Sequence, residues 1–411
     1  MEPFPLPLAS LLGHWGAYVV YLFIGLAFGY VLEIAGFGNA KKLAGQFYFK
    51  DMTVIKVMFG AIIVAMTLIF LATAVGLLNY DLIWVNPTYL WPGILGGLIM
   101  GFGFIIGGFC PGTSLVAAAT LKIDGIFFVL GVFFGIFLFG ETVGLYEDFW
   151  YSSYMGRFTL QDLFGVDAGV VVLGVVIMAL VVFWASEHAE RIFGGMDLSK
   201  APKWRYGAAL GMVVLAGTVM ALGQPTLEER WQRIAPEKEQ LLADRAVQIH
   251  PGEVLSLLED KKVKVVLVDV RSEADYNTFH LQDAMHVLPE ELPDRIQEFR
   301  EQPANTVFVV MSNDETAATE VWKKMVAGSV INVYILENGI NGWIELFSEP
   351  EFLAEHPRIP DAADDQLAYV FNAAVGDRYV SAKPNPEHYE FEYESKVVLQ
   401  VKRGATGGGC G

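Results

Sequence analysis

The chain has 411 residues, of which 54% are hydrophobic and only 18% are charged. Its mean hydropathy of +0.41 is too high for one soluble domain of this size, so we predict a membrane protein. The formal net charge of -18 disfavours binding to nucleic acid, and two cysteines, Cys110 and Cys410, are too few for a disulfide framework or a cysteine-rich metal site.

Six apolar segments in the first half are each about as long as the roughly 20 residues that a membrane helix needs. They cover residues 16–36, 54–78, 92–109, 125–145, 167–186 and 206–223. Residues 1–15 lack the basic region of a signal peptide, so the first segment is expected to remain as an anchor. We therefore predict an α-helical polytopic membrane domain over residues 1–223.

Basic residues in the short loops predict the orientation of these segments, because such loops are retained in the cytoplasm. The loops that carry the basic residues are the first and the fifth: Lys41, Lys42, Lys50 and Lys56, then Lys200, Lys203 and Arg205. Both loops are therefore expected inside. With six spans, the C-terminal region is expected outside, which for a bacterial inner-membrane protein is the periplasm.

The membrane domain contains an internal repeat that relates residues 25–43 to residues 97–115. Gly36-Phe37 aligns with Gly108-Phe109, and Gly38 aligns with Cys110. Duplicated halves are typical of transporters, whose sites lie at the repeat interface and often use broken helices. The two halves differ at the position most able to perform chemistry.

Cys110 lies in a segment that interrupts an apolar stretch, and its glycines and proline are expected to break the helix. The segment is Gly107-Gly108-Phe109-Cys110-Pro111-Gly112-Thr113-Ser114. Unwound backbone at membrane depth is tolerated where it is buried in protein or lines a polar cavity, so freed amides and a thiol could face an anion there. The alternative is that Cys110 is a small buried hydrophobe and that the glycines pack helices closely.

The segments GGFCPGTSL and AGFGNAKKLAGQFYFKDMTVIKVMF resemble the YeeE/YedE family of bacterial thiosulfate transporters over roughly residues 16–223. The resemblance implies an hourglass-shaped fold with short re-entrant helices. It also implies cysteines at the constriction that pass thiosulfate inward by transient S···H–S hydrogen bonds, with Cys110 as one of them. Gly38 stands where a second pore cysteine is expected and the spans are fewer, which favours a half-size subfamily or a homodimer.

Two acidic residues, Glu33 and Glu141, lie within apolar segments, where ionisable groups usually face the bundle interior. Either could couple protons, or its head group could lie at the interface near a helix end. Lys122 could attract an anion, although a cytoplasmic interfacial position explains it as well. The candidate transport site consists of Gly38, Gly108, Cys110, Pro111, Gly112, Thr113 and Ser114, with Glu33 and Glu141 as candidate coupling residues.

After residue 223 the composition becomes that of a soluble protein, with a polar linker predicted at residues 224–250. Continuous β-branched runs predict buried parallel strands at 263–270, 306–312 and 332–337, with helical patterns between them. We therefore predict an α/β domain over residues 251–355 and an acidic extension over residues 356–411, which contains a strand-like KVVLQVK segment.

The segments VVLVDVRSEADYNTFHLQDAMHV at 265–287 and LENGINGW at 336–343 resemble a rhodanese. Rhodanese chemistry uses a cysteine in the loop after the strand at 306–312, where backbone amides hold anionic sulfur. Ser312 occupies that place and cannot carry a persulfide, so the domain is expected to be catalytically silent. It would then serve as a docking module for a protein of sulfur metabolism, with Asp269 and Arg271 as a fold-stabilising pair.

The chain ends in Gly407-Gly408-Gly409-Cys410-Gly411, which resembles the C-terminal arm of the sulfur carrier SoxY. A glycine-rich arm is flexible and would present the Cys410 thiol as a sulfur carrier. The alternatives are a cloning remnant or an incidental free thiol.

The leading hypothesis is a membrane importer of thiosulfate or a related sulfur species, with Cys110 as pore contact and Cys410 as carrier. The rival is a membrane-anchored sulfur carrier in which the helices serve only as an anchor, and a purely structural reading needs neither thiol. No enzyme activity, cofactor or metal is expected. Thiosulfate, persulfide, sulfite and a selenium analogue are not distinguished.

Overall fold

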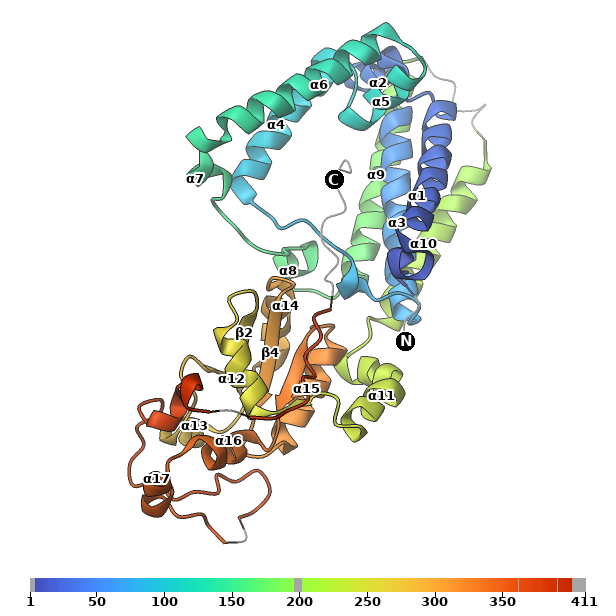
Figure 1. Ribbon diagram of the computed structural model, residues 1–411. Helices are drawn as coiled ribbons and strands as arrows, with labels where there is room; N and C mark the ends of the chain where they lie inside the picture. The colour runs from blue at the N-terminus through green and yellow to red at the C-terminus, as the bar shows by residue number, and fades with distance from the viewer. Residues whose placement is uncertain (1–3, 196–201, 361, 390, 401–411) are drawn as a thin grey trace. The chain divides into compact units, whose positions relative to one another are not determined.

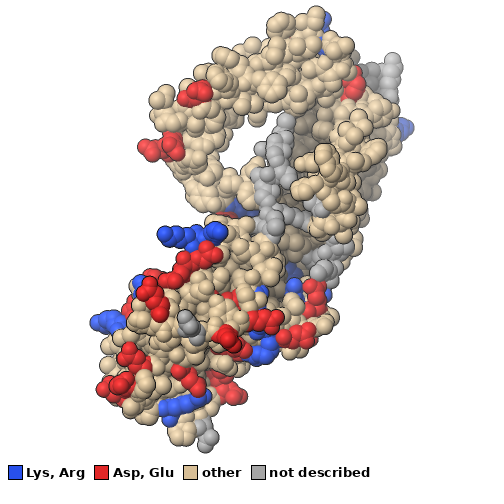
Figure 2. Space-filling model, viewed as in Figure 1, with Lys and Arg blue, Asp and Glu red and all other residues tan. Residues whose placement is uncertain are grey.

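The computed structural model describes residues 4–195, 202–360, 362–389 and 391–400. The chain divides between Gln224 and Pro225 into two compact units, a helical unit and an α/β unit (Figure 1). On the face shown in Figure 2, charged side chains gather on the α/β unit and are sparse on the helical unit. This distribution agrees with a membrane domain joined to a water-exposed one.

The helical unit contains ten α-helices in its described residues. Their bounds are α1 Leu8–Ile34, α2 Ala40–Gly45, α3 Thr53–Ala74, α4 Leu90–Gly107, α5 Pro111–Ala119, α6 Ile123–Thr142, α7 Glu147–Trp150, α8 Leu160–Phe164, α9 Ala168–Phe193 and α10 Trp204–Leu222. Among the described residues, six stretches are long and apolar enough to cross a membrane, and the third joins α4 and α5. The predicted polytopic membrane domain is confirmed.

Helices α3, α9 and α10 pack side by side as a bundle (Figure 1). Small residues permit the close approach. A Cβ atom added at Gly169 of α9 would lie 2.5 Å from Cα of Met220 in α10. The buried residues between the three helices are Ile63, Val172, Val176, Ala179, Ala216 and Val219.

The two repeat segments have the same local conformation. Gly36 and Gly108 follow the long helices α1 and α4 with φ of 78° and 70°, a left-handed conformation that favours glycine. The next residues, Phe37 and Phe109, are both fully or almost fully buried in one apolar cluster. The short helices α2 and α5 then begin. The repeat deduced from the sequence is therefore also present in the backbone.

The α/β unit contains a parallel five-stranded sheet in the order β1-β5-β4-β2-β3. Its elements are α11 Leu227–Ala243, β1 Gln248–Ile249, α12 Pro251–Glu259, β2 Lys264–Asp269, α13 Glu273–Thr278, β3 Met285–His286, α14 Leu292–Glu301, β4 Thr306–Met311, α15 Thr316–Ala327, β5 Val333–Leu336, α16 Gly339–Phe347 and α17 Pro350–Glu355. The three predicted strands correspond to β2, β4 and β5. The edge strands β1 and β3 are too short to give a sequence pattern.

Two segments outside the predicted α/β domain also belong to this unit. Helix α11 lies in the predicted linker and packs against α15, where the rings of Trp231 and Trp322 meet edge to face at 6.2 Å. Residues 396–400, the described part of the KVVLQVK segment, form no strand. Their backbone bonds instead to side chains: Lys396 and Val397 donate to Glu253, and Gln400 donates to Asn332.

Candidate functional site

Cys110 is the N-cap residue of α5, directly before the proline that begins the helix. Its Sγ lies 3.5 Å from the backbone nitrogen of Thr113, which donates to it, and 3.3 Å from Thr113 Oγ1. Thr113 Oγ1 also accepts from the Cys110 backbone nitrogen at 3.0 Å, which completes a capping box. The thiol is therefore held at the positive end of a helix dipole, which favours an anion nearby.

The side chains around the thiol differ in their access. Thr113 and Ser114 are buried, and Ser114 Oγ donates to the carbonyl oxygen of Pro111 at 2.7 Å. Cys110 itself is a free thiol of intermediate exposure. Cys110 is thus partly accessible, whereas the hydroxyl groups of Thr113 and Ser114 are engaged in local bonds.

The repeat partner of Cys110 lies beneath an ion pair. Lys122 Nζ is 3.7 Å from Glu33 Oε1. A Cβ atom added at Gly38 would lie 2.6 Å from Glu33 Oε2, 2.9 Å from Lys122 Nζ and 3.6 Å from Cγ1 of Val116. The charged pair therefore occupies the space that a side chain at position 38, including a second thiol, would need.

The two repeat loops also contact each other. A Cβ atom added at Gly108 would lie 3.1 Å from Cβ of Ala40 and 3.2 Å from its carbonyl oxygen. Gly38 in turn approaches Val116 in the middle of α5. Cys110 stands at the start of the same helix, six residues before Val116. Over these six residues an α-helix rises about 9 Å. The structure thus brings together Gly38, Glu33, Lys122 and the loop of Cys110.

Glu141 is not part of this group. It is exposed in the last turn of α6, whereas the beginning of α6 packs against α5 through Gly125, where an added Cβ would lie 2.4 Å from Cβ of Ala117. The rise along α6 separates these two positions by about 24 Å. Its position near a helix end is the alternative that the sequence left open.

A buried carboxylate that the sequence analysis missed lies on α9. Glu190 is fully buried, accepts from the backbone nitrogen of Met52 at 2.6 Å and forms an ion pair with Lys56. It thereby caps the first turn of α3, whose own N-cap residue offers no side-chain bond. In the sequence, Glu190 is one of several polar residues at the end of α9, and this was the only local sign of a buried carboxylate.

In the α/β unit, Ser312, which the sequence analysis assigned to the place of the rhodanese cysteine, directly follows β4 and is fully buried. Its hydroxyl donates to the carbonyl oxygen of Asp314 at 3.1 Å and accepts from the backbone nitrogen of Ala318 at 3.1 Å. The hydroxyl is therefore engaged in local loop bonds, which is consistent with a structural role.

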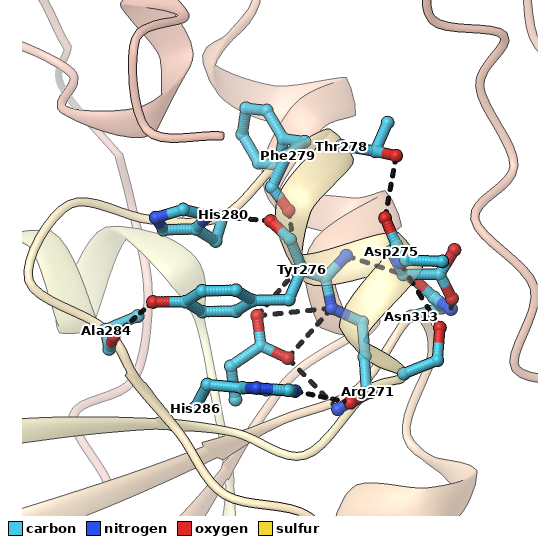
Figure 3. A network of polar contacts seen from close by, with 12 residues as sticks. Arg271, Asp275, Tyr276, Thr278, Phe279, His280, Ala284, His286 and Asn313 are labelled. Carbon is cyan, nitrogen blue, oxygen red and sulfur yellow. Dashed lines mark hydrogen bonds and ion pairs between the residues drawn. The ribbon is translucent and has the colours of Figure 1, made fainter. Parts of the chain in front are cut away.

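A buried ion pair lies beside this loop. Arg271 donates from Nη2 to Asp269 Oδ2 at 2.6 Å and from Nε to Oδ1 at 2.9 Å, and both side chains are almost fully buried. Nη2 also donates to the carbonyl oxygen of Phe279, and Nη1 donates to Asn313 Oδ1 at 3.2 Å (Figure 3). The pair ties the end of β2 to the loop after β4.

Two further carboxylates, Asp314 and Asp365, meet at the loop. Burial raises the pKa of Asp365, and repulsion by Asp314 adds to this effect. For Asp314, burial opposes ionisation, but bonds from the backbone nitrogens of Thr316 and Asp365 outweigh it and lower the pKa. Glu315 instead points to Arg245, whose Nη2 donates to it at 2.7 Å, so it does not add charge to the loop interior.

Within the described ranges, no group of three or more histidine, cysteine, aspartate or glutamate side chains is arranged to hold a metal ion. Cys410 and the glycine-rich arm lie outside the described residues. The arm follows Gln400, which is bonded to Asn332 just before β5. Asn332 precedes β5 at one end of the parallel strands, and Ser312 follows β4 at the other end.

Comparison with known proteins identifies two regions. Residues 35–235 match the family described as Sulphur transport, and residues 250–346 match the Rhodanese-like domain. A crystal structure of a full-length protein from Lactobacillus plantarum is 21% identical, covers 27% of this chain and 93% of its own, and has a TM-score of 0.23. No curated protein matches the chain. The fusion predicted from the sequence is confirmed.

Proposed function

We propose that this chain, in which a sulphur transport domain precedes a rhodanese-like domain, imports thiosulfate or a related inorganic sulfur species across the bacterial inner membrane. The family match indicates transport of a sulfur species. The choice of thiosulfate, the inward direction and the role of each cysteine belong to the proposal.

The observation that carries the proposal is the partly accessible Cys110 thiol at the N-terminus of α5. Thiosulfate has one soft terminal sulfur and three oxygens. The thiol S–H can donate a hydrogen bond to that sulfur, and the helix end favours the negative charge. Lys122 supplies a second positive charge near the far end of the same short helix, beside Glu33.

Transport of radiolabelled thiosulfate into proteoliposomes tests the proposal. Cys110→Ser replaces a polarisable sulfur by a harder oxygen of similar size, so we expect uptake to fall at least tenfold. Cys410→Ser should retain uptake in this purified system, because no carrier partner is present. Equal uptake by wild-type protein and Cys110→Ser, with both variants monodisperse, would contradict the pore role of Cys110.

A second candidate function is a membrane-anchored sulfur carrier in which Cys410 performs the chemistry. The anchored segment before the arm favours it, because residues 396–400 are fixed to Glu253, Tyr334 and Asn332. Under this alternative, incubation with a sulfur donor yields a mass adduct that Cys410→Ser abolishes. Uptake by proteoliposomes would then be absent from the wild-type protein.

A further inference from the structure

The loop after β4 directs two successive backbone N–H groups at one oxygen of the chain itself. Asp365 Oδ1 accepts from the backbone nitrogen of Asn313 at 2.9 Å and lies 3.3 Å from that of Asp314, which also donates to it. Successive amides that converge in this way form a concave site for a negative group. The group that fills it comes from a segment 52 residues later in the chain.

The occupying segment is held at several points. The backbone nitrogen of Asp365 donates to Asp314 Oδ2 at 2.9 Å, and its carbonyl oxygen accepts from Asn313 Nδ2 at 2.8 Å. Asn341 binds the same segment through Gln366 and Ala368. The bonds between Asp314 and Asp365 are reciprocal, as expected for a specific intramolecular ligand rather than a passing surface contact.

The opposite side of the loop is also fixed, which maintains the direction of its amides. Gly339 has φ of 58°, and a Cβ atom there would lie 2.0 Å from the carbonyl oxygen of Asp314 and 2.5 Å from that of Ser312. The loop carbonyls therefore face the start of α16, where Ile340 and Asn341 donate to them.

We infer that this loop is an oxyanion-binding site whose resident ligand is the Asp365 carboxylate. A carboxylate and the SO₃ end of thiosulfate both present oxygens to N–H donors, so they compete for the same two amides. The segment at 362–368 thus keeps small oxyanions out of the rhodanese-like domain. The serine at position 312 prevents persulfide formation, and the Asp365 carboxylate separately prevents oxyanion binding at the loop amides. A single substitution of Asp365 removes the second obstacle.

Hydrogen exchange of the full chain in nanodiscs, followed by mass spectrometry, tests this inference with thiosulfate as the probe. In Asp365→Ala, the peptide that covers residues 312–317 should exchange at least tenfold faster than in the wild-type protein. Added thiosulfate should slow that exchange at least fivefold. Asp364→Ala is the matched control, because Asp364 is adjacent and exposed. Neither it nor the wild-type protein should respond to thiosulfate in this peptide.

Two results would overturn the inference: protection of this peptide by thiosulfate in the wild-type protein, or exchange in Asp365→Ala that matches Asp364→Ala. If Asp365→Ala loosens the whole sheet, the β4 peptide will also exchange faster. In that case, Asp365→Asn is the variant to use. The asparagine keeps an oxygen acceptor without the charge. Asp365→Asn should leave exchange of the β4 peptide slow, and slowing of exchange in residues 312–317 should need a higher thiosulfate concentration than in Asp365→Ala. If thiosulfate has no effect on that peptide in Asp365→Asn, the inference is contradicted.

Discussion

Single positions distinguish the two repeats of the helical unit. Gly36 and Gly108 have the same backbone conformation, and Phe37 and Phe109 have the same burial, yet the next residue is glycine in one repeat and cysteine in the other. The head groups of Glu33 and Lys122 lie close to where a Cβ at position 38 would stand. At this position one repeat carries a thiol, and the other carries a glycine beside the pair of Glu33 and Lys122.

Gly38→Ala is therefore expected to impair transport. The new Cβ would lie within 3 Å of Glu33 Oε2 and Lys122 Nζ, so both flexible head groups must move and their ion pair is disturbed. A partly exposed pair contributes up to about 1 kcal/mol, so uptake should fall by up to about fivefold. Gly29→Ala, in the preceding helix α1, is the control, since nothing lies within 4 Å of a Cβ at that position. Thiosulfate uptake that is equal in the two variants would show that the close contact at Gly38 has no functional role.

The Asp269–Arg271 pair should be important for stability of the α/β unit. Asp269→Asn keeps the shape but leaves the buried guanidinium without its counter-charge, at a cost of about 3–5 kcal/mol. Exchange of the β2 and β4 amides in the full chain measures this loss. Glu345→Gln removes the partner of Arg358 in an exposed pair, so it should cost less than about 1 kcal/mol. Similar costs for both variants would refute the assignment.

At the scale of elements, local sequence patterns predicted the helices, the helix break and the longer strands, because neighbouring residues determine these features. Long apolar runs marked the spans, Gly108 and Pro111 marked the break between α4 and α5, and β-branched runs marked β2, β4 and β5. Contacts between distant segments left no such pattern. Glu190 bonds to Met52, and Asp365 bonds to Asn313, and neither partner could be deduced from spacing along the chain.

The contact between α9 and α3 is expected to stabilise the helical bundle. Glu190→Ala leaves the buried N–H of Met52 without its acceptor and removes the ion pair of Lys56, so unfolding should become easier by about 1–3 kcal/mol. A lower melting temperature of the purified protein in detergent measures the effect. Glu187→Ala, which removes a partly exposed pair with Arg205, provides the comparison and should change it less.

At the scale of the whole molecule, the length of α4 bears on where the two thiols lie. Its 18 residues rise about 27 Å, close to the full thickness of the hydrocarbon core. The loop charges predict that α4 runs from the outside to the cytoplasm. Cys110, three residues beyond the end of α4, is then expected near the cytoplasmic face, whereas the α/β unit with Cys410 is expected on the periplasmic side.

Single-thiol variants test this arrangement, because the chain has only two cysteines. In intact spheroplasts, a membrane-impermeant maleimide should label Cys110→Ser, through Cys410, and should leave Cys410→Ser unlabelled. After lysis, labelling of Cys110→Ser should be unchanged, and Cys410→Ser should become labelled through Cys110. Labelling of Cys110→Ser only after lysis would place the C-terminal unit in the cytoplasm. In that case, incoming sulfur would meet Cys410 after it crosses the membrane, rather than before.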